Sequence, residues 1–120
     1  MSTQTMQAIL VHNYGGPEQL KLEQVQRPEP QAGEVLVRVY AAGVNPVDWK
    51  IRAGLMKDLW PMQFPYIPGS DLAGVVEEVG PGVSAFQPGE AVFGVTNPQF
   101  TGAYAEYAVA EAGLLARKPE

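Results

Sequence analysis

Two segments of the chain carry amide, hydroxyl, carboxylate and ammonium groups beside predicted turns. They are Asn45, Asp48 and Lys50 within AAGVNPVDWKIRAG (residues 41–54), and Ser70 and Asp71 within IPGSDLAGVVEEVG (residues 67–80). An amide or an ammonium group can donate a hydrogen bond to a carbonyl oxygen on which negative charge develops. These residue types therefore suit a pocket that binds a carbonyl group, formed where the two segments meet.

The usual ligands of a transition metal are missing from this sequence. The chain has no cysteine, and its single histidine, His12, falls in a predicted strand far in sequence from both segments. Asn45 and Ser70 offer an amide and a hydroxyl, which are poor zinc ligands beside thiolate and imidazole. Asp71 is a carboxylate, but one carboxylate alone does not hold zinc. We therefore expect no metal site.

A helix is predicted over residues 46–53. Asn45 is a strong N-cap residue, Pro46 suits the first helical position, and Gly54 is a natural stop. Asn45 has two roles that both stay open. Its side-chain oxygen can cap the helix, while its nitrogen points outward to a carbonyl group of a cofactor or of a substrate.

Charged side chains on this helix also have structural interpretations. Asp48 and Arg52 are four residues apart, a spacing that predicts an ion pair. Lys50 lies on the flank of the core-facing side. It either covers apolar surface with its stem while its charge stays in water, or it contacts a bound ligand.

Aromatic and hydroxyl side chains allow similar alternatives. Trp49 and Trp60 either wall a hydrophobic substrate pocket or pack against the fold. Ser70 either hydrogen-bonds a substrate or caps the local backbone. Tyr104 and Tyr107 are three apart in a predicted strand, so we expect them on opposite faces and not in one catalytic cluster.

The rest of the chain alternates short strands with turns rich in glycine and proline. The predicted strands cover residues 6–12, 20–26, 34–40, 71–79, 90–95 and 103–109. Residues 34–40 place Val35, Val37 and Val39 on one face, with a period of two. Residues 55–68 are rich in proline and aromatic side chains and are predicted to form a loop. This pattern indicates a mainly β, antiparallel, barrel-like domain with a helix near its mouth.

Length and composition narrow the classes of function. The chain has 120 residues, which fits one domain, and it is 46% hydrophobic and 18% charged, as in globular proteins. A net charge of −5 with scattered basic residues argues against nucleic-acid and anionic-membrane partners. The first lysine or arginine is Lys21, so the start of the chain lacks the charged region of a signal peptide. We expect a cytoplasmic protein.

Together the two segments resemble the catalytic domain of the medium-chain dehydrogenase/reductase superfamily, and within it the zinc-independent quinone oxidoreductase branch, the zeta-crystallin type. In zinc-dependent members a cysteine ligand stands at the position matching Asn45, and a His-Glu pair at the positions matching Ser70 and Asp71. Lys50 stands where related enzymes often carry a tyrosine that contacts NADP. The resemblance implies a GroES-like, partly open antiparallel β-barrel with one or two short helices over residues 1–120.

The resemblance also implies an activity, namely hydride transfer from NADPH to a quinone or an α,β-unsaturated carbonyl without zinc. The residues it implicates are Asn45 and Ser70 in catalysis, Lys50 and Asn45 in cofactor binding, and Trp49 and Trp60 in the substrate pocket. NADP(H) would be held mainly by a Rossmann domain C-terminal to Glu120, because the glycine-rich dinucleotide fingerprint is not found in the sequence. The full-length enzyme would be a homodimer, and the 120-residue chain alone would be inactive.

A non-catalytic GroES-like binding or co-chaperone module is the alternative. Such a module needs an apolar partner-binding loop, and residues 55–66 contain Leu55, Met56, Leu59, Trp60, Met62 and Phe64. Against this alternative stands VNPVDWK (residues 44–50), which a co-chaperonin has no reason to carry. Size in solution separates the two, because a large ring differs plainly from a monomer or a dimer.

Overall fold

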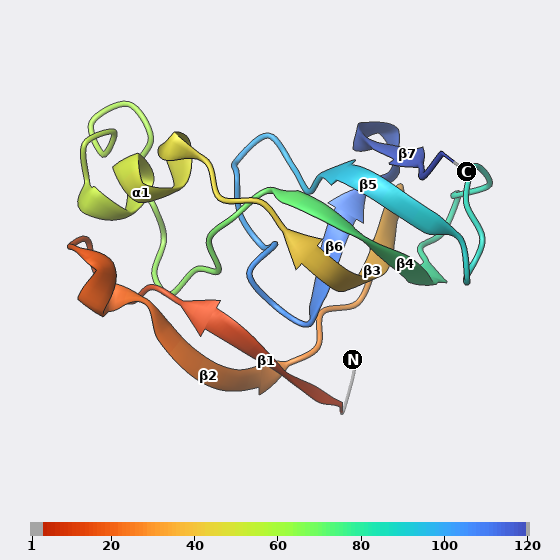
Figure 1. Cartoon of the computed structure of the whole chain (residues 1–120), viewed down its shortest axis with the longest axis horizontal. Helices are drawn as coiled ribbons and strands as arrows, with labels where there is room; N and C mark the ends of the chain where they lie inside the picture. Colours follow the sequence, from red (N-terminus) through yellow and green to blue (C-terminus); the bar gives the residue numbers. More distant parts are fainter. Residues whose placement is uncertain (1–3, 120) are drawn as a thin grey trace.

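The computed structural model describes residues 4–119, which form a mainly β molecule with the α-helix at one end (Figure 1). The strands are β1 (Thr5–Leu10), β2 (Lys21–Gln26), β3 (Glu34–Ala42), β4 (Asp71–Val79), β5 (Ala91–Val95), β6 (Tyr107–Glu111) and β7 (Leu115–Arg117). The helices are the 3-10 turns η1 (Pro17–Gln19) and η2 (Ala112–Leu114), and the α-helix α1 (Pro46–Ala53). Within the described residues, no helix is both long and apolar enough to cross a membrane.

The strands form two antiparallel sheets. β1 pairs with β2, and the other strands follow the order β6-β3-β4-β5-β7. Isolated bridges, Ala8 with Ala105 and Val11 with Tyr66, join the hairpin to the rest of the molecule. Because these bridges do not extend into ladders, the strands do not close into a continuous barrel. The structure thus confirms the expected mainly β, antiparallel and incompletely closed architecture.

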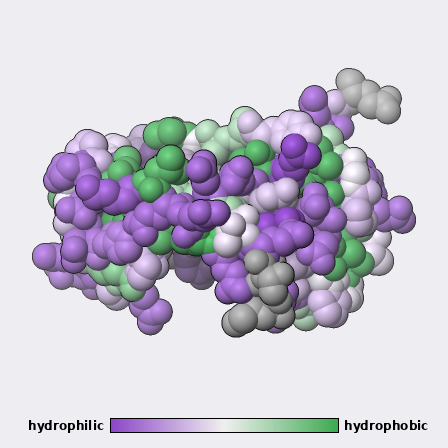
Figure 2. Space-filling view, turned by 90° about the horizontal axis from the view of Figure 1, so that it is seen from below, coloured by the Kyte–Doolittle hydropathy of each residue, from purple (hydrophilic) through white to green (hydrophobic). Residues whose placement is uncertain are grey.

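Buried apolar side chains form three clusters. The largest lies against the five-stranded sheet and consists of Val35, Val37, Leu72, Val76, Phe86, Val92, Ala103, Ala108 and Ala110. The second contains Met6, Ala8 and Leu10 of β1, and the third contains Val11, Ile51 and Tyr66, which anchor α1. On the hairpin side the surface is mostly hydrophilic, with hydrophobic side chains confined to smaller patches (Figure 2).

The structure explains two features that the sequence indicates, the bounds of helix α1 and the glycine inside strand β4. The helix spans Pro46–Ala53 as predicted, and Gly54 ends it at φ 85°, in the left-handed region that glycine adopts without strain. A Cβ at Gly74 would lie 2.0 Å from the carbonyl oxygen of Arg38. Only glycine therefore lets β4 approach β3 this closely, which explains a glycine inside a strand.

The C-terminal part departs from the prediction. The sequence predicts a strand over residues 103–109, whereas β6 begins only at Tyr107. The preceding backbone bonds elsewhere: the N–H of Ala103 donates to the oxygen of Gly69, and that of Tyr104 to the oxygen of Pro68, each at 3.0 Å. Strand β7 and the two 3-10 turns are too short to show a period and were not predicted.

Candidate functional site

The start of α1 and the start of β4 are joined by a side-chain hydrogen bond. The amide nitrogen Nδ2 of Asn45 donates to Oδ2 of Asp71 at 2.7 Å. The backbone reinforces this contact, because the N–H of Gly43 donates to the carbonyl oxygen of Asp71 at 3.0 Å. Asn45 and Asp71 are both half-buried. The structure therefore brings together the two polar segments that the sequence places at one pocket.

Asp48 lies beneath this contact and is only 6% exposed. Its Oδ2 accepts hydrogen bonds from the backbone N–H of Asn45 at 2.9 Å and from the hydroxyl of Tyr104 at 3.0 Å. The predicted ion pair with Arg52 is wrong. The Nε of Arg52 instead donates to the carbonyl oxygen of Gly15 at 3.3 Å, while Asp48 is turned toward the start of its own helix.

Two tyrosines beside Asp48 have strongly raised pKa values. Burial raises the pKa of Tyr104 to about 12, and the charge of Asp48 and the hydrogen bond to it add to the effect. Burial also raises the pKa of Tyr66 to about 12, against the opposing effect of Arg52. Both hydroxyls are thus protonated at neutral pH. The hydroxyl of Tyr66 and Oδ1 of Asp48 are buried without a hydrogen-bond partner among the described residues.

Asn45, Asp48, Asp71 and Tyr104 are linked by these hydrogen bonds, and we call this group the α1 corner. Tyr104 is the member of the group that the sequence pattern did not indicate. The sequence places it in a strand with Tyr107, whereas it lies in the loop before β6 and reaches α1. Tyr107 is elsewhere, with the guanidinium of Arg27 3.8 Å from its ring centre. The expected placement of the two tyrosines on opposite faces of one strand is wrong, because Tyr104 lies outside β6. The role of Asp48 had a local signal, because an acid three residues after Asn45 has capping-box spacing. Tyr104 had no such local signal, because its partner Asp48 is 56 residues away in sequence.

The other candidate residues have different surroundings. Ser70 is 2% exposed, and its carbonyl oxygen accepts from the N–H of Thr96 at 2.9 Å, so its backbone ties the loop to the end of β5. Lys50 is exposed, with its Nζ 5.9 Å from the ring centre of Trp49. Ser70 is thus built into the fold, while the ammonium group of Lys50 faces solvent.

The two tryptophans lie in different places. Trp49 is 46% exposed and borders a pocket of about 140 Å³ that Asp48 and Tyr104 also line. Trp60 stands with its ring centre 5.9 Å from that of Phe100 and does not line this pocket. Of the two, Trp49 alone lines the pocket that Asp48 and Tyr104 also line.

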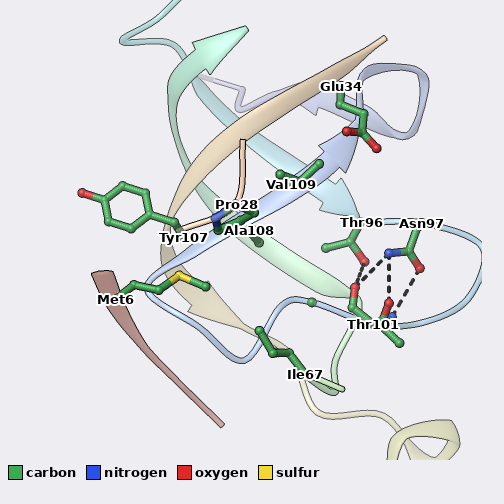
Figure 3. A pocket seen from close by; sticks show the side chains of 11 residues that line it. Met6, Pro28, Glu34, Ile67, Thr96, Asn97, Thr101, Tyr107, Ala108 and Val109 are labelled. Carbon is green, nitrogen blue, oxygen red and sulfur yellow. Dashed lines mark hydrogen bonds between the residues drawn. The ribbon is translucent and has the colours of Figure 1, made fainter. Parts of the chain in front are cut away.

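A larger pocket, of about 240 Å³, lies between the hairpin and β6 (Figure 3). Its apolar wall is formed by Met6, Pro28, Ile67, Tyr107 and Val109. The polar groups on its other side bond to one another: Thr96 Oγ1 donates to the carbonyl oxygen of Thr101 at 2.6 Å, and Asn97 Nδ2 donates to the same oxygen at 3.0 Å. Nowhere among residues 4–119 do three or more His, Cys, Asp or Glu residues gather as a metal site.

Comparison with known proteins gives a consistent set of matches. Residues 31–120 match the alcohol dehydrogenase GroES-like domain. The chain is 43% identical to a chloroplastic quinone-oxidoreductase homolog of Spinacia oleracea and 46% identical to a quinone oxidoreductase of Homo sapiens, with 100% and 96% of the chain covered. It spans only 37% and 34% of the lengths of these relatives.

A solved mycobacterial structure complexed with NADPH also matches. Its TM-score is 0.86 and its sequence identity is 38%, and the match covers 96% of this chain and 34% of that one. The similarity therefore extends from sequence to three-dimensional structure over nearly all of the chain.

Proposed function

The chain belongs to the family of alcohol dehydrogenase GroES-like domains, and from this premise we propose that it is the substrate-side domain of a zinc-independent, NADPH-dependent reductase. The names of its relatives support a quinone as the hydride acceptor, with an α,β-unsaturated carbonyl as the related class, and the NADPH complex supports the cofactor. The chain spans about a third of these relatives, and we propose that the complete activity belongs to a longer protein in which a Rossmann domain follows residue 120.

The observation that carries this proposal is the hydrogen bond between Asn45 and Asp71. It joins the two segments at the positions where zinc-dependent members carry their ligands. The carboxylate accepts from an amide, so the pair offers a neutral donor in place of thiolate and imidazole ligands. An amide N–H suits a carbonyl oxygen, either of the nicotinamide carboxamide or of the acceptor.

Lys50 is the second group that we assign to the nicotinamide half of the cofactor. It is exposed, and among residues 4–119 its ammonium group has no ion-pair partner. Its N–H donors are therefore available for a ribose hydroxyl or for the acceptor oxygen. Trp49 lines the neighbouring pocket together with Asp48 and Tyr104, and it would cover an apolar acceptor there. The catalytic role of Ser70 stays a prediction, and because this residue is only 2% exposed we propose that it acts by holding the start of β4 in place. For Trp60 we propose a more distant part of the substrate wall.

The proposed reaction needs positioning and hydrogen-bond donors, but no metal. When bound, NADPH supplies a hydride, and the acceptor takes this hydride and one proton from solvent, so that a quinone becomes a hydroquinone and NADP⁺ is left. Asn45 and Lys50 hold the reacting ends together, which replaces an encounter in solution by a fixed geometry. Trp49 excludes water from one side of the reacting pair.

Oxidation of NADPH by the full-length protein tests the proposal. We expect NADPH to be consumed in the presence of a simple quinone, in protein purified without chelator that elemental analysis finds free of zinc. The isolated 120-residue chain should give a cooperative, β-rich fold by circular dichroism but no turnover. Stoichiometric zinc in the active protein would contradict the zinc-independent assignment, and failure to oxidise NADPH would contradict the reductase.

The co-chaperone alternative has less support. Met56, Met62 and Phe64 pack against the core cluster under α1 and are thus not free to bind a partner, although Leu55 and Leu59 are exposed. The relatives are named as oxidoreductases. We propose a cytoplasmic homodimer for the full-length protein. Light scattering and cell fractionation would test this, and a large ring in solution would favour the co-chaperone.

A further inference from the structure

The hydrogen bond to Asp71 fixes the orientation of the Asn45 amide. An ionised carboxylate only accepts hydrogen bonds, so the nitrogen Nδ2, and not the oxygen, must face Oδ2 of Asp71 at 2.7 Å. The backbone of Asn45 is held as well, because its N–H donates to the buried carboxylate of Asp48. With both ends held, the orientation of the amide is fixed, and its second N–H remains as a donor besides the bond to Asp71.

The negative charge of Asp71 is not cancelled by a neighbouring cation. No lysine, arginine or histidine of residues 4–119 forms an ion pair with Asp71. Half-buried carboxylates act over several ångströms, because the effective dielectric near a protein surface is below that of water. A group bound at Asn45 therefore feels this charge, which attracts a cation and repels an anion.

The two ligands that could bind at Asn45 change charge in opposite senses during hydride transfer. The oxygen of the acceptor becomes negative, so a nearby carboxylate would oppose the reaction there. The nicotinamide ring becomes positive when it gives up its hydride, so the same carboxylate would favour the product form of the cofactor. Electrostatics thus distinguishes two roles that the geometry of the amide alone leaves open.

We propose that Asp71 is a positioning residue that presents the Asn45 amide to the nicotinamide end of the cofactor and favours its oxidised form. The acceptor oxygen is then served by another donor, for which exposed Lys50 has the suitable charge. This inference rests on the proposed function, because it requires that the full-length protein binds NADP(H). It deepens that function by separating the cofactor side of the corner from the acceptor side.

Dissociation constants for NADPH and NADP⁺, measured by calorimetry on the full-length protein without acceptor, test the inference. Asp71→Asn keeps the size of the side chain and can still accept a hydrogen bond. We expect this substitution to raise the dissociation constant of NADP⁺ about threefold to tenfold more than that of NADPH, since only the oxidised ring is positive. Glu78→Gln is the matched control, because it removes one exposed charge from the same strand about 20 Å away, beyond the screening length in physiological salt.

A double-mutant cycle with Asn45→Ala tests the positioning. If Asp71 acts on NADPH through Asn45, Asp71→Asn should have little further effect on the NADPH constant once Asn45 is alanine. An unchanged ratio of the two constants in Asp71→Asn would overturn the inference, whatever the variant does to the melting temperature. A wild-type protein that binds both nucleotides leaves the proposed function intact in that case. Failure of the wild type to bind either nucleotide would overturn the proposed function and this inference together.

Discussion

The corner at the start of α1 and the pocket of Figure 3 differ in how their polar groups are used. In the larger pocket, Thr96, Asn97 and Thr101 bond to one another beside an apolar wall. In the smaller corner, a buried carboxylate holds two donors with one oxygen while its other oxygen has no partner among the described residues. The corner is therefore more costly to bury than the larger pocket.

The volume of a pocket therefore does not by itself identify a functional site. In the pocket of about 240 Å³, Thr96, Asn97 and Thr101 satisfy one another, and these bonds are explained by the stability of their loop. The pocket of about 140 Å³ is bordered by a buried acid, Asp48, and by Tyr104, whose pKa is raised. Titratable groups with shifted pKa values gather at functional sites, which favours this smaller pocket as the site.

Replacing Asp48 by alanine should lower the free energy of unfolding by about 2–4 kcal/mol. The substitution removes the acceptor of the Asn45 N–H and of the Tyr104 hydroxyl, and each donor left buried costs about 1–3 kcal/mol. Urea unfolding of the 120-residue chain would measure it. Asp58→Ala, at an exposed loop position, is the control and should change stability by less than about 0.5 kcal/mol. Equal effects of the two variants would contradict the structural role of Asp48.

Replacing Lys50 by alanine should reduce kcat/KM of the full-length enzyme roughly tenfold to a hundredfold, because a charge-assisted hydrogen bond is lost. Stability should stay the same, since the side chain is exposed. Steady-state kinetics with NADPH and a quinone would measure the effect, with Lys57→Ala as a control on a neighbouring exposed lysine. Full activity of Lys50→Ala would make Lys50 an ordinary surface residue.

In the larger pocket, Thr96→Val should cost about 1 kcal/mol of stability, the usual net value of one hydrogen bond, here the 2.6 Å bond to Thr101. Nucleotide binding and turnover should remain within about twofold of the wild type. A loss of nucleotide affinity in Thr96→Val without loss of stability would reverse the assignment of the two regions.

The last prediction concerns alkaline pH. A tyrosine whose pKa is about 12 in the folded protein and about 10 in the unfolded chain keeps its full contribution to stability below pH 10. Above pH 10 the unfolded chain loses the proton first, so stability falls as the pH rises toward 12. Ultraviolet titration should find Tyr66 and Tyr104 ionising late, and Tyr104→Phe should remove one late transition. Ionisation of all tyrosines near pH 10 before unfolding would contradict the burial of this corner.

Local patterns predicted most of the elements but only part of the site. The span of α1 follows from Asn45, Pro46 and Gly54, because caps and stops are neighbours in sequence. The course of residues 103–106 could not be foreseen, because their backbone bonds to residues 68 and 69 in place of a strand ladder. For the same reason Tyr104 had no local signal.

The predicted ion pair between Asp48 and Arg52 is wrong for a different physical reason. Spacing on a helix shows which side chains can meet, but not which partners compete for them. Asp48 stands near the helix start, where a free backbone N–H and a buried hydroxyl are better matched to a buried carboxylate than a half-exposed arginine.

Backbone amide shifts of isotope-labelled full-length protein, recorded during titration with NADPH, would show which of the two regions binds the cofactor. If the α1 corner receives the cofactor, the largest shifts within residues 4–119 should fall at residues 43–50 and 70–71, with little change at residues 96–102 and 107–109. Shifts concentrated at residues 96–102 and 107–109, with the α1 corner unchanged, would show that the pocket of Figure 3 is the binding region and would contradict the account.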